Sequence, residues 1–228
     1  MQFRDRHVVV TGGMGALGGA VVEALVAAGA TCHIPLRENK SAAPARPNVK
    51  LYAGVELSDE AAVARLFAAI ERPWASIHIA GGFLAAPVSE TSGRDAAQQM
   101  ETNFMSAFLC CHFAVRAMMQ AGGGRIVNVA ARPALEWRAG SGMAAYTASK
   151  AAVAALTVAL AEEVARHGIL VNAVAPSIMD TPANRNAMPK AKFDDWPKVG
   201  EVANTIVFLA SPDNKVTRGA IVPVYGRA

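Results

Sequence analysis

The sequence has few of the features that mark exported or metal-binding proteins. Cysteine occurs three times in 228 residues, at Cys32 and at the adjacent pair Cys110 and Cys111, and there is no CxxC or Cys/His spacing suited to a metal. An odd count without such spacing predicts reduced thiols rather than disulfides or a zinc site. We therefore expect a cytoplasmic protein with no bound metal.

Concentrated positive charge and long apolar runs are also missing. Lys and Arg number 22 against 18 Asp and Glu, which gives a net charge of +4, but the basic residues are scattered and form no stripe of the kind that binds nucleic acid. Charge or glycine interrupts every apolar run well before the roughly 20 residues needed to cross a bilayer, and no cleavable signal pattern precedes the first strand. We expect a soluble protein without nucleic-acid or membrane partners, and an anionic cofactor matches the charge better.

Short β-branched runs alternate with Ala-rich helical segments along the whole chain. This alternation predicts an α/β fold in one domain, 1–228, with a doubly wound parallel sheet of about seven strands and helices on both faces. Residues 38–48 contain two prolines, so we expect a short or absent helix there. The first expected strand begins at His7. The other six cover residues 31–36, 49–55, 75–82, 124–131, 169–176 and 219–226.

A glycine-rich turn follows the first expected strand directly and precedes a helix. Gly13, Gly15 and Gly18 satisfy GxGxxG, in which glycines allow the backbone to approach a pyrophosphate at the helix N-terminus. The second strand ends at Leu36 and Arg37, where sites for the unphosphorylated dinucleotide place an acid on the ribose hydroxyl. Because that acid is missing and Arg37 can bind a 2′-phosphate, the sequence favours NADP(H), with NAD(H) as the alternative.

Tyr146 and Lys150 lie four residues apart in an expected helix, so their side chains share one face. A nearby cation lowers the pKa of a phenol from about 10, which would make Tyr146 a proton donor or acceptor near neutral pH. The alternative is a packing ring beside a solvated amine. Asn103, inside an expected long helix over 93–120, is a polar amide among apolar residues, so it either holds a functional water or satisfies a kinked backbone.

The segments TGGMGALG, IAGG, GRIVNVAA, YTASK, VNAVAPS and DTP, together with Asn103, occur in one order along the chain. In these motifs the sequence resembles the classical short-chain dehydrogenase/reductase family over nearly its whole length. The resemblance implies a Rossmann-type domain, a small-molecule substrate, and homodimers or homotetramers built on the helices of Asn103 and Tyr146. It implies that Tyr146 exchanges the proton, that Lys150 binds the nicotinamide ribose and lowers the pKa of Tyr146, and that Asn103 holds a relay water. It further implies cofactor contacts from Gly12, Gly13, Met14, Gly15, Ala16, Leu17, Gly18, Arg37, Ala80, Gly81, Tyr146, Lys150, Pro176, Met179 and Thr181.

The chain departs from the family pattern at four places. Ala16 replaces the middle glycine of the turn, His78 and Ile79 replace two asparagines, and Ser177 replaces a glycine. The catalytic serine of the family falls on Ala131. Loss of one oxyanion donor costs on the order of 100-fold to 1000-fold in rate, so its absence points to an activated acceptor.

The sequence is therefore compatible with two functions. The first is an NAD(P)H-dependent reduction of a carbonyl or quinonoid-type acceptor, beneath a substrate lid at about 177–198. Within the family the pattern is similar to the dihydropteridine reductases, most specifically in the loop DTPANRNAMPKAKFDDW. The second is a dinucleotide-binding sensor or scaffold that has lost catalysis.

Overall fold

The computed structural model of the protein describes residues 2–38 and 46–227. Its centre is a sheet of seven parallel strands in the order β3-β2-β1-β4-β5-β6-β7. This confirms the predicted doubly wound, Rossmann-type α/β fold. The prediction for 38–48 falls largely on residues 39–45, which lie outside the described part of the chain. The strands are β1 (His7–Thr11), β2 (Thr31–Pro35), β3 (Val49–Tyr52), β4 (Pro73–His78), β5 (Gly124–Val129), β6 (Ile169–Pro176) and β7 (Ile221–Val224).

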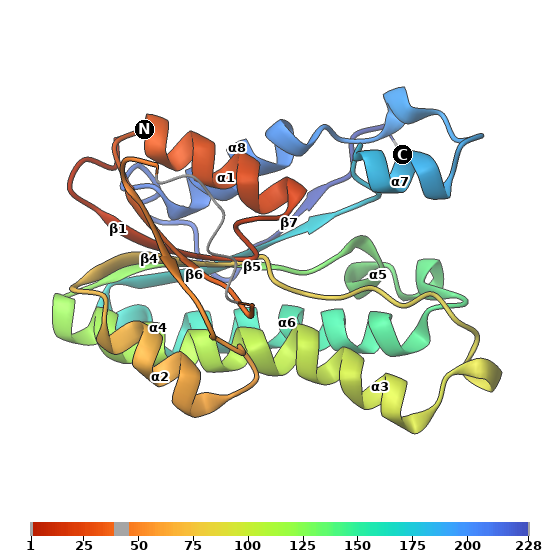
Figure 1. The fold of residues 1–228 in the computed structure, drawn as a ribbon, viewed down its shortest axis with the longest axis horizontal. Coiled ribbons are helices and arrows are strands. Elements are labelled where there is room, and N and C mark those ends of the chain that lie inside the picture. The colour runs from red at the N-terminus through yellow and green to blue at the C-terminus, as the bar shows by residue number, and fades with distance from the viewer. Residues whose placement is uncertain (1, 39–45, 228) are drawn as a thin grey trace.

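Helices cover both faces of the sheet in two layers (Figure 1). On one face, α1 (Ala16–Ala27) and α8 (Val199–Ala210) pack against the strands and bury one core cluster. On the other face, α2 (Glu60–Ala68), α4 (Ser106–Ala121) and α6 (Ala144–Glu163) bury a second cluster. Burial on both faces explains why strands such as β6, whose eight residues are all buried, are apolar almost throughout.

The strand order reverses between β1 and β4, because the chain builds outward from β1 to β3 and then returns to β4. In doubly wound sheets, ligands bind at such a reversal, outside the carboxyl ends of the strands. Gly12 and Ile79, which directly follow β1 and β4, therefore mark the edge at which a site is expected.

The long helix expected over 93–120 is not regular. The structure divides it into α3 (Gly93–Gln99), the π-helical segment η2 (Met100–Met105) and α4. The stretch 177–198 contains the helix α7 (Pro182–Ala187) and the short turn η5 (Phe193–Asp195), so it is more ordered than its Pro- and Asn-rich sequence predicts. The remaining short elements are η1 (Val88–Glu90), α5 (Arg132–Leu135), η3 (Trp137–Gly140) and η4 (Ala165–His167).

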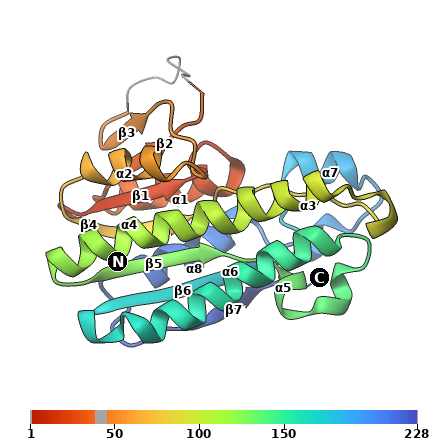
Figure 2. The same cartoon turned by 90° about the horizontal axis from the view of Figure 1, so that it is seen from below.

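Two helical stretches, 93–121 and 144–163, are long and apolar enough to cross a membrane by length and composition alone. Both contribute buried residues to the second core cluster, which is also how core helices of globular proteins pass such a test. Viewed from below, α4 and α6 run side by side along the sheet (Figure 2).

Candidate active site and cofactor crevice

The glycine turn is locked against the end of β4. Gly12 has φ +67°, and a β-carbon there would lie 2.9 Å from the backbone nitrogen of Ala80. The Thr11 hydroxyl accepts hydrogen bonds from the N–H groups of Ile79 and Ala80, both at 3.1 Å. A β-carbon at Gly18 would collide with the carbonyl oxygen of Gly12. The turn thus requires glycine for close approach of its own backbone as well as for any ligand.

A crevice of about 490 Å³ opens beside this turn at the carboxyl edge of the strands. Seven of the expected cofactor residues line it: Gly12, Gly13, Met14, Gly15, Arg37, Ala80 and Gly81. A β-carbon at Gly15 would meet only the Gly12 carbonyl, at 3.4 Å, so no side chain beyond those of its two chain neighbours approaches that position. This backbone cradle at the start of α1 suits a dinucleotide pyrophosphate. Sequence reasoning missed several other lining residues, among them Glu56, Ser58, Gln98, Glu101, Thr102 and Ser106.

The other expected cofactor residues are not among those that line the crevice. Leu17 belongs to α1 and is buried in the core, and Pro176 is buried at the end of β6. The Thr181 hydroxyl caps α7 by accepting from the Asn184 N–H at 3.2 Å, and the Met179 carbonyl accepts from the Asn184 side chain at 2.8 Å. Their expected contacts with the cofactor therefore stay a prediction.

Arg37 lies at the end of the crevice that the sequence assigns to the adenosine ribose. Its side chain is 76% exposed, and its Nε lies 3.5 Å from an Oε of Glu56. Glu56 belongs to the segment after β3. The sequence pattern for a ribose-binding acid concerns only the end of β2, so it does not reveal Glu56. The crevice therefore presents a cation with an acid beside it.

Asn103 lies in the π-helical segment η2 and is almost fully buried. Its Oδ1 accepts from the Gly82 N–H at 2.9 Å, and its Nδ2 donates to the Gly82 carbonyl and to the Ser149 hydroxyl, both at 3.0 Å. Ser149 donates in turn to the Tyr146 carbonyl at 2.7 Å. The wider π turn thus directs the amide toward the loop after β4 and toward α6, which favours a backbone-satisfying role for Asn103.

Tyr146 and Lys150 both lie on α6, as expected, but their electrostatics differ from the expectation. The Lys150 ammonium is buried and donates to the Val129 carbonyl at 2.8 Å. Burial raises the pKa of Tyr146 to about 12 and lowers that of Lys150 to about 8. The expected fall in the pKa of Tyr146 is therefore wrong for the protein's own groups, because burial disfavours the charged phenolate.

Gly81 joins the crevice to these side chains. A β-carbon at Gly81 would lie 2.5 Å from Oδ1 of Asn103 and 3.3 Å from Nζ of Lys150. Two residues later, the Phe83 ring meets the Tyr146 ring edge-on, with centroids 4.9 Å apart. Phe83 is 64% exposed, so a large apolar surface stands open beside the phenol.

Ala131 is buried where β5 ends, with extended backbone angles, and it precedes α5. Its methyl group offers no hydrogen-bond donor at this position. Ser141 is exposed beyond η3, ten residues away along the chain. Near Ala131, Arg132 pairs with Glu136 at 2.7 Å and lies over the Tyr225 ring, 4.9 Å from its centroid.

The expected lid, 177–198, is held by one carboxylate. Asp180 is 9% exposed and binds Arg185 through both oxygens, at 2.6 and 2.8 Å, and Lys198 at 2.7 Å. These two cations hold the pKa of Asp180 well below its usual range. Arg185 also lies over the Phe193 ring, and Phe193 packs on Trp196. The residues that carry the loop likeness therefore fold the segment itself.

The remaining residues singled out from the sequence are internal. His78 is buried between Ser76 and Asn128, each at 2.7 Å, and burial lowers the pKa of His78 to about 4. The three cysteines are buried and form no disulfide. Among the described residues, no group of three or more His, Cys, Asp or Glu side chains is arranged to hold a metal.

Comparison with known proteins identifies the family to which the chain belongs. A family model for short chain dehydrogenases matches residues 6–192. Galactitol 2-dehydrogenase of Rhizobium johnstonii is 35% identical over 240 residues, covering 96% of this chain and 93% of the relative. Cis-4-hydroxycyclohexanecarboxylate dehydrogenase of Sinomonas cyclohexanicum is 34% identical, covering 98% and 96%.

Solved structures with a similar fold point to the same family. A short-chain type dehydrogenase/reductase from Mycobacterium ulcerans superposes with a TM-score of 0.89 at 25% identity, covering 100% of this chain and 90% of the other. ElxO with NADP bound superposes with a TM-score of 0.87 at 25% identity, covering 97% of both chains. The chain belongs to the short-chain dehydrogenase family and is an NAD(P)-dependent oxidoreductase.

Proposed function

We propose that the protein transfers hydride from NADPH to a carbonyl or quinonoid-type small molecule, with Tyr146 as proton donor. The observation that carries the proposal is the contact at Gly81, which lines the crevice and lies against both Asn103 and Lys150. When bound in the crevice, a dinucleotide would supply the hydride. The chain supplies the proton, orients the reacting groups and provides a positive charge that stabilises the phenolate.

The proton leaves the phenol of Tyr146 and bonds to the atom of the acceptor that gains negative charge. A phenol with a pKa near 12 remains protonated at neutral pH and can still donate to a developing alkoxide, which is more basic. Lys150, with a pKa near 8, remains mostly charged at pH 7, so it favours the phenolate that is left behind. Solvent then returns a proton to Tyr146, and Asn103 orders the loop beside this path.

The acceptor class follows from Ala131 and Phe83. Because Ala131 offers no hydroxyl to an oxyanion, the substrate must accept hydride without that donor, as an electrophilic or quinonoid ring does. The exposed face of Phe83, in contact with Tyr146, suits a flat apolar ring held over the reacting atoms. Both features favour a planar activated acceptor over a simple alkyl ketone.

The decisive experiment is Tyr146→Phe. We expect turnover to fall by at least about 100-fold, while the Kd of NADPH stays within about threefold, because the ring is kept and only the acidic proton is lost. Tyr52→Phe is the matched control, since Tyr52 bonds His33 on β2 and lies outside the crevice. Equal turnover in Tyr146→Phe and the wild type would reject the proton-donor role.

For the cofactor, Arg37 supports NADPH, whereas Glu56 beside it opposes a phosphate. A charge-assisted hydrogen bond is worth about tenfold or more in affinity. We therefore expect Arg37→Gln to lower kcat/KM for NADPH at least about tenfold with little change for NADH, and Glu56→Gln to raise the NADPH value. If Arg37→Gln affects both cofactors equally, the preference is set elsewhere.

A sensor or scaffold that binds the dinucleotide without chemistry is the second candidate. The replacements at Ala131, His78 and Ile79 favour it. Titration of NADPH fluorescence followed by a screen of carbonyl and quinonoid compounds separates the two, because a sensor binds NADPH and never oxidises it.

We also infer a cytoplasmic homodimer or homotetramer. Met105, Phe108 and Met119 on η2 and α4, and Val158 on α6, are each at least 37% exposed on the helices that the family resemblance assigns to subunit pairing. Light scattering after size exclusion should give a multiple of 23.7 kDa, reduced to the monomer by Phe108→Glu.

A further inference from the structure

A second cavity, of about 540 Å³, lies at the opposite edge of the sheet from the crevice. Its walls come from the residues just before β1 and β4 and from the start of β5. The cofactor crevice is built from the other ends of the same β1 and β4 strands. The two hollows are therefore separated by the length of the strands and share no lining residue in the described part of the chain.

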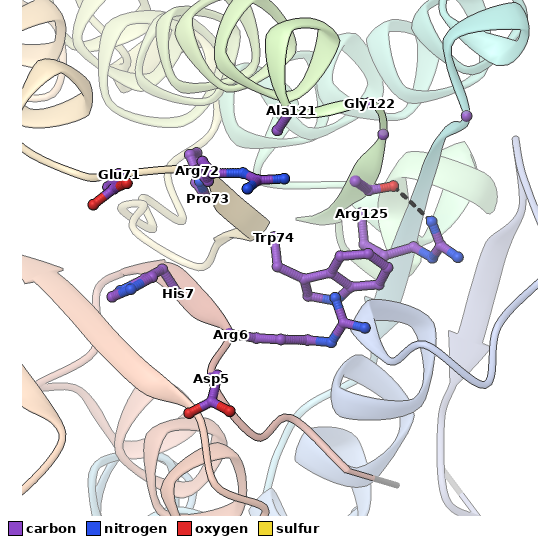
Figure 3. Close-up of a pocket in the computed structure, with 13 residues that line it drawn as sticks. Asp5, Arg6, His7, Glu71, Arg72, Pro73, Trp74, Ala121, Gly122 and Arg125 are labelled. Carbon is purple, nitrogen blue, oxygen red and sulfur yellow. Dashed lines mark hydrogen bonds between the residues drawn. The ribbon is translucent and has the colours of Figure 1, made fainter.

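Three guanidinium groups line this cavity, on Arg6, Arg72 and Arg125 (Figure 3). The Arg6 guanidinium lies 3.6 Å from the centroid of the Trp74 ring, and that of Arg125 lies 4.9 Å from it. Trp74 is itself fixed, because its indole N–H donates to the Ala210 carbonyl at 3.0 Å. One indole thus gathers two like charges, and Figure 3 shows Arg72 reaching toward the same space.

No carboxylate of the described residues forms an ion pair with any of the three. Asp5 and Glu71 also line the cavity, but in Figure 3 they stand on the side away from Arg125. Arg125 is 8% exposed, and it donates to the carbonyls of Gly124 and Asn214 through three N–H groups. A guanidinium has five such donors, so two remain. Like charges held together with donors to spare are an arrangement that an anion stabilises.

Two residues that line the cavity have left-handed backbone angles. Only three described residues other than glycine have positive φ, and two of them, Asp5 at 59° and Arg72 at 44°, line this cavity. Such backbone angles are unfavourable for a residue like Arg and collect at ligand sites. Arg72 thus lines the cavity from a segment whose backbone angle is unusual for arginine.

We propose that this cavity binds a dianionic oxyanion, carried by inorganic phosphate or by the phosphoryl group of a small metabolite. Arg6 and Arg125 supply fixed charge at the base, and Arg72 closes on the ligand from the rim. The Trp74 face is covered by Arg6, so recognition is by charge and hydrogen bonding rather than by stacking of a ring. The site is distinct from the proposed reaction and does not depend on it.

The chain carries three tryptophans, Trp74, Trp137 and Trp196, and only Trp74 lines this cavity. Protein labelled with 5-fluorotryptophan is therefore titrated with inorganic phosphate at constant ionic strength, with NADPH saturating so that the cofactor crevice is filled. We expect the fluorine signal of Trp74 to shift saturably while the other two stay in place. A glycerol phosphate arm then compares a phosphoryl ester with free phosphate.

Arg72→Gln is the main variant, because Arg72 is exposed and its loss leaves the core intact. We expect its Kd for phosphate to rise about tenfold, as for loss of one charge-assisted bond. The control is Arg65→Gln, which changes an exposed arginine on α2 and should leave the Kd unchanged. A shift that grows linearly with phosphate, or an equal Kd in Arg72→Gln and the wild type, overturns the proposal, as does loss of binding in Arg65→Gln.

Discussion

Restoring the missing hydroxyl in Ala131→Ser tests the assignment of the acceptor class most directly. Ala131 has an extended backbone and directly precedes α5, where serine is a favoured residue. The second helical residue is Pro133, which has no N–H, so the Ser hydroxyl can accept only from Ala134. Its own hydrogen is then left to donate to an acceptor outside α5.

The expected size follows from the worth of one positioned donor. A donor to a developing oxyanion lowers the barrier by roughly 3 to 4 kcal/mol, or 100-fold to 1000-fold. An unactivated ketone needs that donor, whereas an electrophilic ring does not. We expect Ala131→Ser to raise kcat/KM for an unactivated ketone by up to about 100-fold and to change the rate for a quinonoid acceptor less than about threefold.

Stopped-flow oxidation of NADPH with the two acceptors in parallel measures this ratio. Ala130→Ser is the matched control, because Ala130 belongs to a small buried cluster with Ala134, Ala154 and Ala175, where a hydroxyl meets packed methyl groups. The variant should be less stable and should gain no ketone activity. An equal gain for both acceptors in Ala131→Ser would refute the link between the missing serine and an activated substrate.

Three further predictions concern the surroundings of the site. Gly81→Ala should lower kcat/KM at least about tenfold, because its β-carbon would lie 2.5 Å from an amide oxygen and 3.3 Å from the Lys150 ammonium, while Gly93→Ala, which meets nothing within 4 Å, should be neutral. The pKa of Lys150 falls from 10.5 to about 8 on folding, so its buried charge costs stability below pH 8 and this cost fades as the pH rises to about 10.5. In urea unfolding, the stability of Lys150→Met relative to the wild type should therefore decline over that window, and a difference independent of pH would contradict it. Asp180→Asn should speed tryptic cleavage within 177–198, since two cations lose their partner, whereas Asp195→Asn should cleave like the wild type.

The layered fold was predictable because its signals are local. Strands buried on both faces are apolar almost throughout, so their alternation with helical segments predicted the sheet. The glycine turn, Arg37, Ala80 and Gly81 were placed at one edge for the same reason, since parallel strands end together.

The lining residues that sequence reasoning missed lie far from any motif. Glu56 follows β3, and Thr102 lies on the π-helical turn, so only the packing of these segments against β1 and β4 brings them to the crevice. The interruption of the helix over 93–120 was also hidden, because a π turn has no composition of its own. Buried polar groups such as Asn103 gave the single local hint.

The sequence by itself determined the order of strands and helices, the glycine turn, and the shared face of Tyr146 and Lys150, since each depends on spacing along the chain. Only the tertiary structure decided the sign of the pKa shift at Tyr146, because burial is a property of all the segments packed around the phenol. It alone also gathered Arg6, Arg72 and Arg125 at the far edge of the sheet. Residues distant in sequence carry no local pattern, so their encounter is fixed only when the sheet closes.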